Sequence, residues 1–191
     1  GGNRGPAMLP AELVEACRDR PLLLGFLEAV AAACDPATGL PVKSRLDVVR
    51  MGRQGILPNV WILERCADGR LRYRLAGEEV IYSLGSSPRG KTLEEVLGGE
   101  AMARFAPVFF SILDDRTVMY QRGPAHRGSR LFYYGYRVFV PMCERGAEPT
   151  LVLCCHDRER PEKRAVLEAG LTFRDDQVRF FPLRPDGGAG S

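Results

Sequence analysis

The chain has 191 residues, of which 45% are apolar and 27% charged, a composition typical of a globular domain that forms a core without disulfides or a metal. Its formal net charge of +3 is too small to predict a nucleic-acid partner, and no run of about 18 apolar residues predicts a membrane span. The six cysteines form no CxxC pair, and the opening residues carry no charged-then-apolar leader pattern, so we expect reduced thiols and a cytoplasmic protein.

Helical patterns come first along the chain. Apolar spacing predicts helices over Met8–Cys17 and Pro21–Cys34, and a shorter helix over Ser44–Gly55. One face of the second helix is apolar, and a small sheet domain contains nothing that must cover it. We therefore expect a homodimer through this face, whose residues are Leu23, Phe26, Leu27 and Val30.

A hairpin follows the helices. Val60–Cys66 and Arg70–Ala76 alternate as strands do, and the Asp68-Gly69 pair between them predicts a tight turn because both residue types accept a positive φ. One face of the second strand is expected to be buried and carries Leu71, Tyr73 and Leu75. The period of two ends at Gly77, where helical spacing begins.

A helical crossover and further strands complete the order. Gly77–Gly85 and Gly99–Asp115 are predicted helices, and Thr92 with Glu95 predicts a capping box at the start of a short helix between them. The predicted strands are Thr117–His126, Leu131–Met142 and Thr150–His156, followed by a tail strand near Gln177–Leu183. This order predicts an α+β fold with one five-stranded antiparallel sheet, a helical crossover on one of its faces, and N-terminal helices.

Three motifs along this order resemble those of a PAS domain, and more closely those of the single-domain PAS proteins of alphaproteobacteria. Their residues are Leu40, Pro41, Lys43, Ser44, Leu46 and Asp47 before the first strand, Tyr73, Arg74 and Gly77 at the end of the second, and Gly85, Gly90 and Lys91 in the next turn. The segment Tyr136–Met142 also resembles that family. We accordingly expect an N-terminal helical extension over residues 1–39, a PAS domain over 40–158, and a tail over 159–191 that holds a short helix and a strand.

The resemblance implies a sensory or signalling module that binds a small molecule or a protein partner in or through its core and catalyses no reaction. The candidate pocket residues are Ile62, Tyr73, Leu75, Ile81, Leu84, Phe105, Phe109, Tyr134, Tyr136 and Leu153. No kinase, cyclase or DNA-binding module is recognised in the chain, so we expect a separate signalling protein as the output partner. Two alternatives stay open, namely a ligand-free interaction scaffold and a small-molecule enzyme.

The resemblance also places Gly77 at the corner between the second strand and the crossover. Glycine suits such a corner because it has no Cβ to clash. Arg74, three residues earlier, can hold helix carbonyls or a carboxylate with its two-pronged guanidinium group. We expect both residues to have a structural role.

Patterns for a cofactor or a catalytic centre are weak. The cysteine motif of flavin-adduct PAS domains is absent, and neither His126 nor His156 lies in the crossover, where haem-binding PAS domains place their ligand. Cys154 and Cys155 should point to opposite faces of a strand, which disfavours a metal site. The stretch GSSPRGKT matches a phosphate-loop pattern literally, but it follows a helix and contains Pro88. We therefore expect no metal and no catalytic residue, and the sequence leaves the cofactor unknown.

Overall fold

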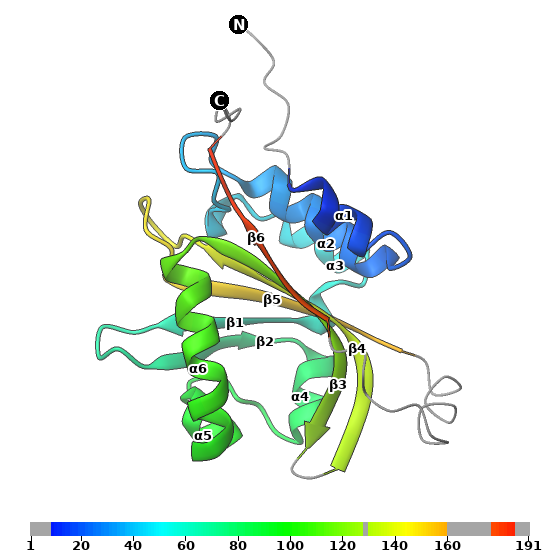
Figure 1. The fold of residues 1–191 in the computed structure, drawn as a ribbon, viewed down its shortest axis with the longest axis vertical. Helices are drawn as coiled ribbons and strands as arrows, with labels where there is room; N and C mark the ends of the chain where they lie inside the picture. Colours follow the sequence, from blue (N-terminus) through cyan, green and yellow to red (C-terminus); the bar gives the residue numbers. More distant parts are fainter. Residues whose placement is uncertain (1–8, 128–129, 160–176, 186–191) are drawn as a thin grey trace, which may run out of the picture.

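The computed structural model describes residues 9–127, 130–159 and 177–185 of the chain. In this part, one six-stranded antiparallel sheet of order β2-β1-β5-β4-β3-β6 lies between two groups of helices (Figure 1). The strands are β1 (Val60–Arg65), β2 (Leu71–Ala76), β3 (Thr117–Arg127), β4 (Arg130–Met142), β5 (Leu151–Arg158) and β6 (Gln177–Pro182). The helices are α1 (Ala11–Ala16), α2 (Pro21–Ala33), α3 (Val48–Arg53), α4 (Glu78–Leu84), α5 (Leu93–Leu97) and α6 (Gly99–Asp114), with short 3-10 turns η1 (Lys43–Arg45) and η2 (Leu57–Asn59).

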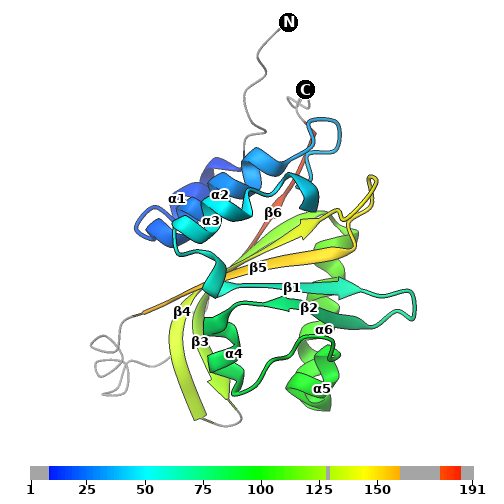
Figure 2. The same cartoon turned by 180° about the vertical axis from the view of Figure 1, so that it is seen from behind.

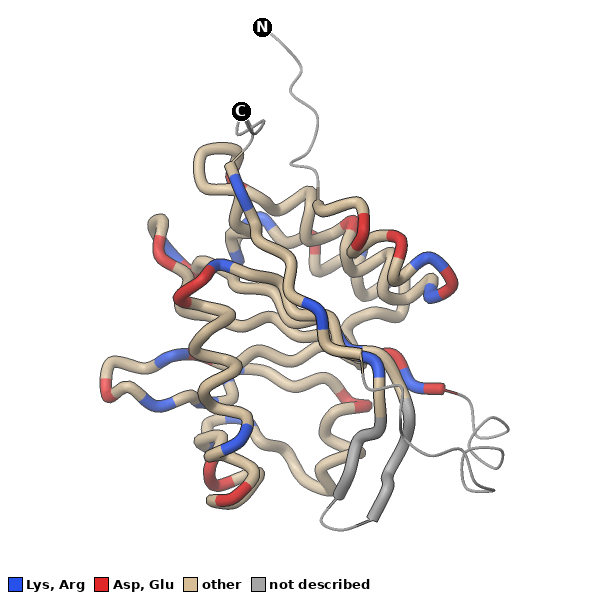
Figure 3. The backbone as a smooth tube through the Cα atoms, viewed as in Figure 1, with Lys and Arg blue, Asp and Glu red and all other residues tan. Residues whose placement is uncertain are grey.

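The connections follow the predicted order. The hairpin β1–β2 is followed by the crossover α4–α6, and the meander β3–β4–β5 returns to pair β5 with β1 (Figure 2). The predicted α+β class and the antiparallel sheet are confirmed. The sheet has six strands because the predicted tail strand joins it beside β3. Charged residues gather mainly in turns and near the ends of the described elements, so that few of them lie at the centre of the sheet (Figure 3).

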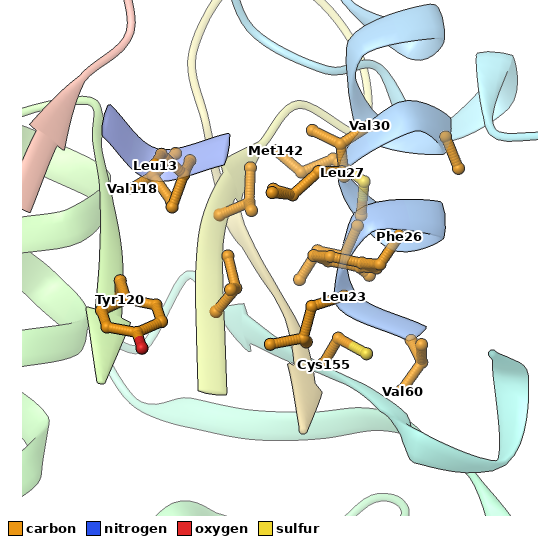
Figure 4. Packing of buried hydrophobic residues seen from close by; sticks show 14 of the residues in the cluster. Leu13, Leu23, Phe26, Leu27, Val30, Val60, Val118, Tyr120, Met142 and Cys155 are labelled. Carbon is orange, nitrogen blue, oxygen red and sulfur yellow. The ribbon is translucent and has the colours of Figure 1, made fainter. Parts of the chain in front are cut away.

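The helices α1, α2 and α3 cover one face of the sheet, which we call the N-terminal face. Strand residues such as Val118, Met142 and Cys155 belong there to one core with the apolar side of α2 (Figure 4). The four predicted dimer residues lie in this core with at most 2% of their surface exposed: Leu23, Phe26, Leu27 and Val30. The sheet of the same chain already covers them, so the prediction that they form a dimer surface is wrong.

The helices α5 and α6 cover the opposite face, which we call the crossover face. Its core contains Leu63, Tyr73 and Phe139 from the sheet and Phe109 and Ile112 from α6. The capping box predicted at the start of α5 is present, since Thr92 accepts from the Glu95 amide and the Glu95 carboxylate accepts from the Thr92 amide. Local sequence thus starts the crossover helix, and buried apolar contacts hold the crossover on the sheet.

A β-bulge interrupts the hairpin at Arg74. Ile62 pairs with Leu75 while Leu63 pairs with Tyr73, so Arg74 is the extra residue on β2. Paired residues of antiparallel strands share a face, and Leu75 is therefore shifted to the side of Ile62, where it is 42% exposed. The expectation that Tyr73 and Leu75 share a buried face is wrong because the bulge reverses the alternation.

Gly77 lies at the corner between β2 and α4, as predicted. Its φ of −73° is ordinary, so a left-handed backbone is not the reason for a glycine. A Cβ at this position would lie 2.2 Å from the carbonyl oxygen of Leu57 and 2.4 Å from that of Pro58. The Gly77 amide also donates to the Val60 carbonyl at 2.8 Å. Glycine is required here because the backbone of η2 approaches closely.

Candidate functional site

Four aromatic rings form a cluster on the crossover face. Trp61, the only tryptophan of the chain, stacks on Tyr73 with 5.6 Å between ring centres and an interplanar angle of 17°. Phe109 and Phe139 both meet the Trp61 ring edge-on, at 6.2 and 5.9 Å, and lie 5.6 Å from each other. Stacked and edge-to-face pairs are the favourable arrangements of aromatic rings. We call these four residues the aromatic cluster.

Each ring of the aromatic cluster comes from a different element. β1 supplies Trp61, β2 supplies Tyr73, β4 supplies Phe139 and the crossover helix α6 supplies Phe109. Tyr73 is only 3% exposed, and burial raises the pKa of its phenol above the usual value. The hydroxyl is therefore neutral at physiological pH and can only act as a hydrogen-bonding group. The cluster joins the crossover to both halves of the sheet.

Basic side chains continue the same face beyond the aromatic cluster. Phe139 pairs with Cys154, and the next pair on that face is Arg137 with His156, followed by Gly135 with Arg158. Two residues along a strand span about 7 Å, so this basic group begins within one side-chain length of the cluster. We call Arg137, His156 and Arg158 the basic group.

His156 is a buried, uncharged member of the basic group. It is 4% exposed, and its pKa is lowered to about 3 by burial and by the positive charges of Arg158 and Arg137. A neutral imidazole both donates and accepts a hydrogen bond, whereas the two guanidinium groups only donate. The basic group therefore combines two positively charged side chains with one uncharged ring.

Arg158 connects the basic group to the crossover. Its guanidinium donates to the Glu79 carbonyl at 2.5 Å and to the hydroxyl of Ser83, and lies 3.5 Å from the Glu79 carboxylate. Both partners belong to α4, the first crossover helix. The side chain of Arg158 is 21% exposed, so this contact lies at the border between core and solvent. It ties the end of β5 to α4.

Asp157, the residue before Arg158 on β5, makes the corresponding contact on the N-terminal face. Arg20, at the start of α2, donates to the Asp157 carboxylate at 2.8 Å and to the Arg158 carbonyl at 3.2 Å. Its guanidinium also lies 4.3 Å from the ring centre of Tyr136, whose hydroxyl donates to Glu159 at 3.1 Å. The end of β5 is therefore held by α4 on one face and by α2 on the other.

The structure separates the ten candidate pocket residues. Tyr73 and Phe109 lie together in the aromatic cluster. Ile62, Tyr136 and Leu153 instead belong to the core under the N-terminal helices, so the predicted shared pocket is wrong for them. On β1, β4 and β5 the neighbouring residues face the crossover instead, namely Trp61, Phe139 and Cys154.

The other candidates lie further out. Phe105 on α6 and Leu75 on β2 are 37% and 42% exposed, which is more than a buried pocket wall allows. Ile81 and Leu84 are half-buried on α4. Tyr134 belongs to β4, but its side chain lies outside the described residues. A role in ligand binding stays a prediction for Tyr73, Phe109, Ile81 and Leu84.

Arg74 forms a two-pronged contact with carboxylates, one of the two kinds of partner expected for it, although neither carboxylate belongs to the crossover. Its guanidinium donates to Glu64 at 2.6 Å and to Glu144 at 3.0 Å, and these carboxylates raise its pKa further. Glu64 lies on β1 and Glu144 follows β4, so the contact joins strands of the sheet rather than the sheet and the crossover. Arg74 is thus a clasp at the bulge, away from the aromatic cluster.

The adjacent cysteines of β5 point to opposite faces, as predicted. Cys154 packs in the crossover core and Cys155 in the N-terminal core, and burial raises the pKa of both thiols well above the usual value. Within the described ranges, no group of three His, Cys, Asp or Glu side chains is placed to hold a metal ion. Among the described helices, none has the length and apolar character needed to cross a bilayer.

Comparison with known proteins gives similarity in fold. No family model matches the chain, and no curated protein matches it. The solved PAS domain of BvgS from Bordetella pertussis is similar, with 16% identity over 64% of this chain and 94% of that chain and a TM-score of 0.46. A LOV protein of Rhodobacter sphaeroides is similar over 58% of this chain and 64% of that chain, with 10% identity and a TM-score of 0.41. The strand order β2-β1-β5-β4-β3 with a helical crossover after β2 agrees with the antiparallel sheet and crossover expected from the sequence.

Proposed function

We propose that this chain is a cytoplasmic sensory or signalling module of the single-domain PAS type found in alphaproteobacteria, which binds a small molecule at the crossover face and catalyses no reaction. The order and spacing of the motifs from Leu40 to Lys91 support the family. The observation that carries the proposal is the continuity of the aromatic cluster with the basic group on one face. Apolar and aromatic side chains beside a few directed polar groups are the typical lining of small-molecule sites.

The chemistry of this face indicates the class of ligand. The half-buried ring of Trp61 suits contact with a planar group, and the positive charges of Arg137 and Arg158 on the same face suit a carboxylate or another anionic oxygen. The neutral imidazole of His156 adds an acceptor without adding charge. A small planar molecule that carries an acidic group fits these requirements best.

The end of β5 supplies a route from this face to an output partner. Arg158 is held by α4, and the adjacent Asp157 is held by Arg20 at the start of α2. A ligand that draws Arg158 away from Ser83 would move the backbone that positions Asp157. A separate signalling protein that contacts α2 would then distinguish the bound state from the free state.

Native mass spectrometry of the purified full chain tests this proposal. We expect a co-purifying mass that is released on denaturation and whose removal changes the emission of Trp61. A Phe109→Leu variant should retain less of this mass, whereas the matched variant Phe105→Leu, one turn earlier on the same helix at a position 37% exposed, should retain it fully. Both variants must be compared at a temperature at which far-ultraviolet circular dichroism shows them folded, since loss of a buried aromatic destabilises the fold.

The close packing of the aromatic rings favours a second candidate function for the chain. The ring centres of Trp61, Phe109 and Phe139 lie within 6.2 Å of one another, as they do in a core that side chains already fill. In that case the chain is a ligand-free interaction scaffold. A native mass equal to the sequence mass or to a whole multiple of it, together with a Trp61 emission that no added planar acid changes, would favour the scaffold and contradict the sensor.

A further inference from the structure

In the part of the chain that the structure describes, β6 is an edge of the sheet, and its outer backbone groups can be assigned. The Leu183 amide donates to the Arg116 carbonyl at 3.0 Å, and the register runs from there as pairs such as Pro182 with Thr117 and Phe181 with Val118. Hydrogen-bonded and non-hydrogen-bonded pairs alternate along an antiparallel ladder. The odd-numbered residues of β6 therefore bond to β3, and the backbone groups of Val178, Phe180 and Pro182 point to the open edge.

The position of Pro182 agrees with this assignment. Proline has no N–H and is tolerated only where a strand needs no donor towards its neighbour. Pro182 leaves the ladder to β3 intact because its nitrogen points outward. The open edge therefore carries the amides of Val178 and Phe180 and the carbonyls of all three residues.

The side chains on this edge are apolar and exposed. Phe180 pairs with Met119 and Val178 with Gln121, which places both on the side of the crossover face. Met119 is 5% exposed beneath the helices, but Phe180 and Val178 are 48% and 49% exposed. Edge strands of stable monomers usually carry charge or a bulge that prevents pairing. Among the residues of β6, the only charged side chain is Arg179, which points to the opposite face.

We propose that two copies of this chain pair through β6 in antiparallel fashion about a twofold axis at Phe180. Phe180 then faces Phe180 of the other copy, Val178 faces its Pro182, and Arg179 faces its Phe181. The Phe180 amides and carbonyls bond to each other, and the Val178 amide donates to the Pro182 carbonyl of the other copy. The two six-stranded sheets become one continuous sheet.

The charge of Arg179 favours the register with the axis at Phe180 over the register with the axis at Arg179. A shift of the axis to Arg179 would also align outward backbone groups, but it would set two arginines directly opposite each other, which destabilises a strand pair. With the axis at Phe180, each Arg179 lies beside an aromatic ring of the other copy, as it already lies 5.0 Å from the ring centre of its own Phe181. The surface is thus complementary to itself, which is the requirement for a twofold dimer.

Analytical ultracentrifugation of the full chain tests the dimer and its register together. Because position 180 faces itself, the variants Phe180→Glu and Phe180→Lys should each weaken dimerisation about tenfold or more, through repulsion and the loss of an apolar pair. An equimolar mixture of the two variants should dimerise again. The control Val49→Glu, at an exposed apolar position of α3 that is 60% exposed, should leave the dimer unchanged.

Hydrogen exchange of the unmodified protein provides a test that needs no variant. The amides of Val178 and Phe180 should become protected as the protein concentration rises, whereas the amide of Arg179, which bonds to β3, should be protected at every concentration. A chain that stays monomeric at its highest soluble concentration overturns the proposal. So does a dimer that both Phe180 variants leave intact, or one that the mixture fails to restore. Each outcome is independent of whether the crossover face binds a ligand.

Discussion

Because His156 is buried, we expect the chain to lose stability in mild acid. The variant His156→Gln should not show this loss. In the folded chain the pKa of His156 is lowered to about 3, first by burial and then by the charges of Arg158 on β5 and Arg137 on β4. In the unfolded chain the same imidazole titrates near its ordinary value of 6.5. Below that value only the unfolded state gains a proton. The contribution of His156 to the unfolding free energy is therefore complete above about pH 6.5, and it decreases as the pH is lowered until the folded state also titrates.

The size of the effect follows from the two pKa values. One pKa unit corresponds to about 1.4 kcal/mol, and pH 5 lies about 1.5 units below the unfolded pKa and well above the folded one. The wild-type chain should therefore lose about 2 kcal/mol of unfolding free energy between about pH 7 and pH 5 through this residue. The carboxylates with lowered pKa, Glu95 and Glu144, contribute only nearer to and below the ordinary value of 4.5.

Urea unfolding at the two pH values, followed through the emission of Trp61, measures this difference. The variant His156→Gln keeps a polar side chain of similar length but cannot titrate, so its unfolding free energy should change by much less over the same range. Equal losses in the wild type and in His156→Gln would refute the reasoning, because the acid sensitivity would then come from other groups.

Two predictions concern the fold around the site. Gly77→Ala should cost about 2–3 kcal/mol, because the new methyl group would lie 2.2 Å from the Leu57 carbonyl oxygen, and rigid backbone must move. The control Gly69→Ala has φ +78° and open space around it, so it should cost only about 1 kcal/mol of backbone strain; equal midpoints in urea would contradict the crowding argument. Leu27→Glu should destabilise the chain by more than about 3 kcal/mol, since it buries a charge at a position 2% exposed. A folded Leu27→Glu protein that changes only from dimer to monomer would instead restore the α2 face as an interface.

Local sequence was sufficient to predict most elements and their order. The Asp68-Gly69 turn between two alternating segments predicted the β1–β2 hairpin, and Gly69 has the positive φ that such a turn requires. Thr92 and Glu95 predicted the capping box of α5, and both of its hydrogen bonds are present. These features were predictable because each depends on residues within a few positions of one another.

The candidate site was only partly predictable. Tyr73 and Phe109 were expected on one face and lie there, but their partners Trp61 and Phe139 were missed. The available signal was the alternation in β4, which places Arg137 and Phe139 on one face of the strand and Tyr136 and Val138 on the other. Both sets can be buried in a sheet that has helices on its two faces, so alternation alone could not decide which set faces the crossover.

The sequence by itself determined the element types, the antiparallel order and the glycine at the corner after β2, because these depend on local geometry and on short connections. Only the tertiary structure decided which face each strand residue occupies. The bulge at Arg74 shifts Leu75 by one position, and a one-residue shift sends a side chain to the other face. The tertiary structure also decided that the apolar side of α2 packs on its own sheet. Burial of an apolar face is favourable against any apolar surface, so the sequence pattern cannot specify whether that surface belongs to the same chain or to a second copy.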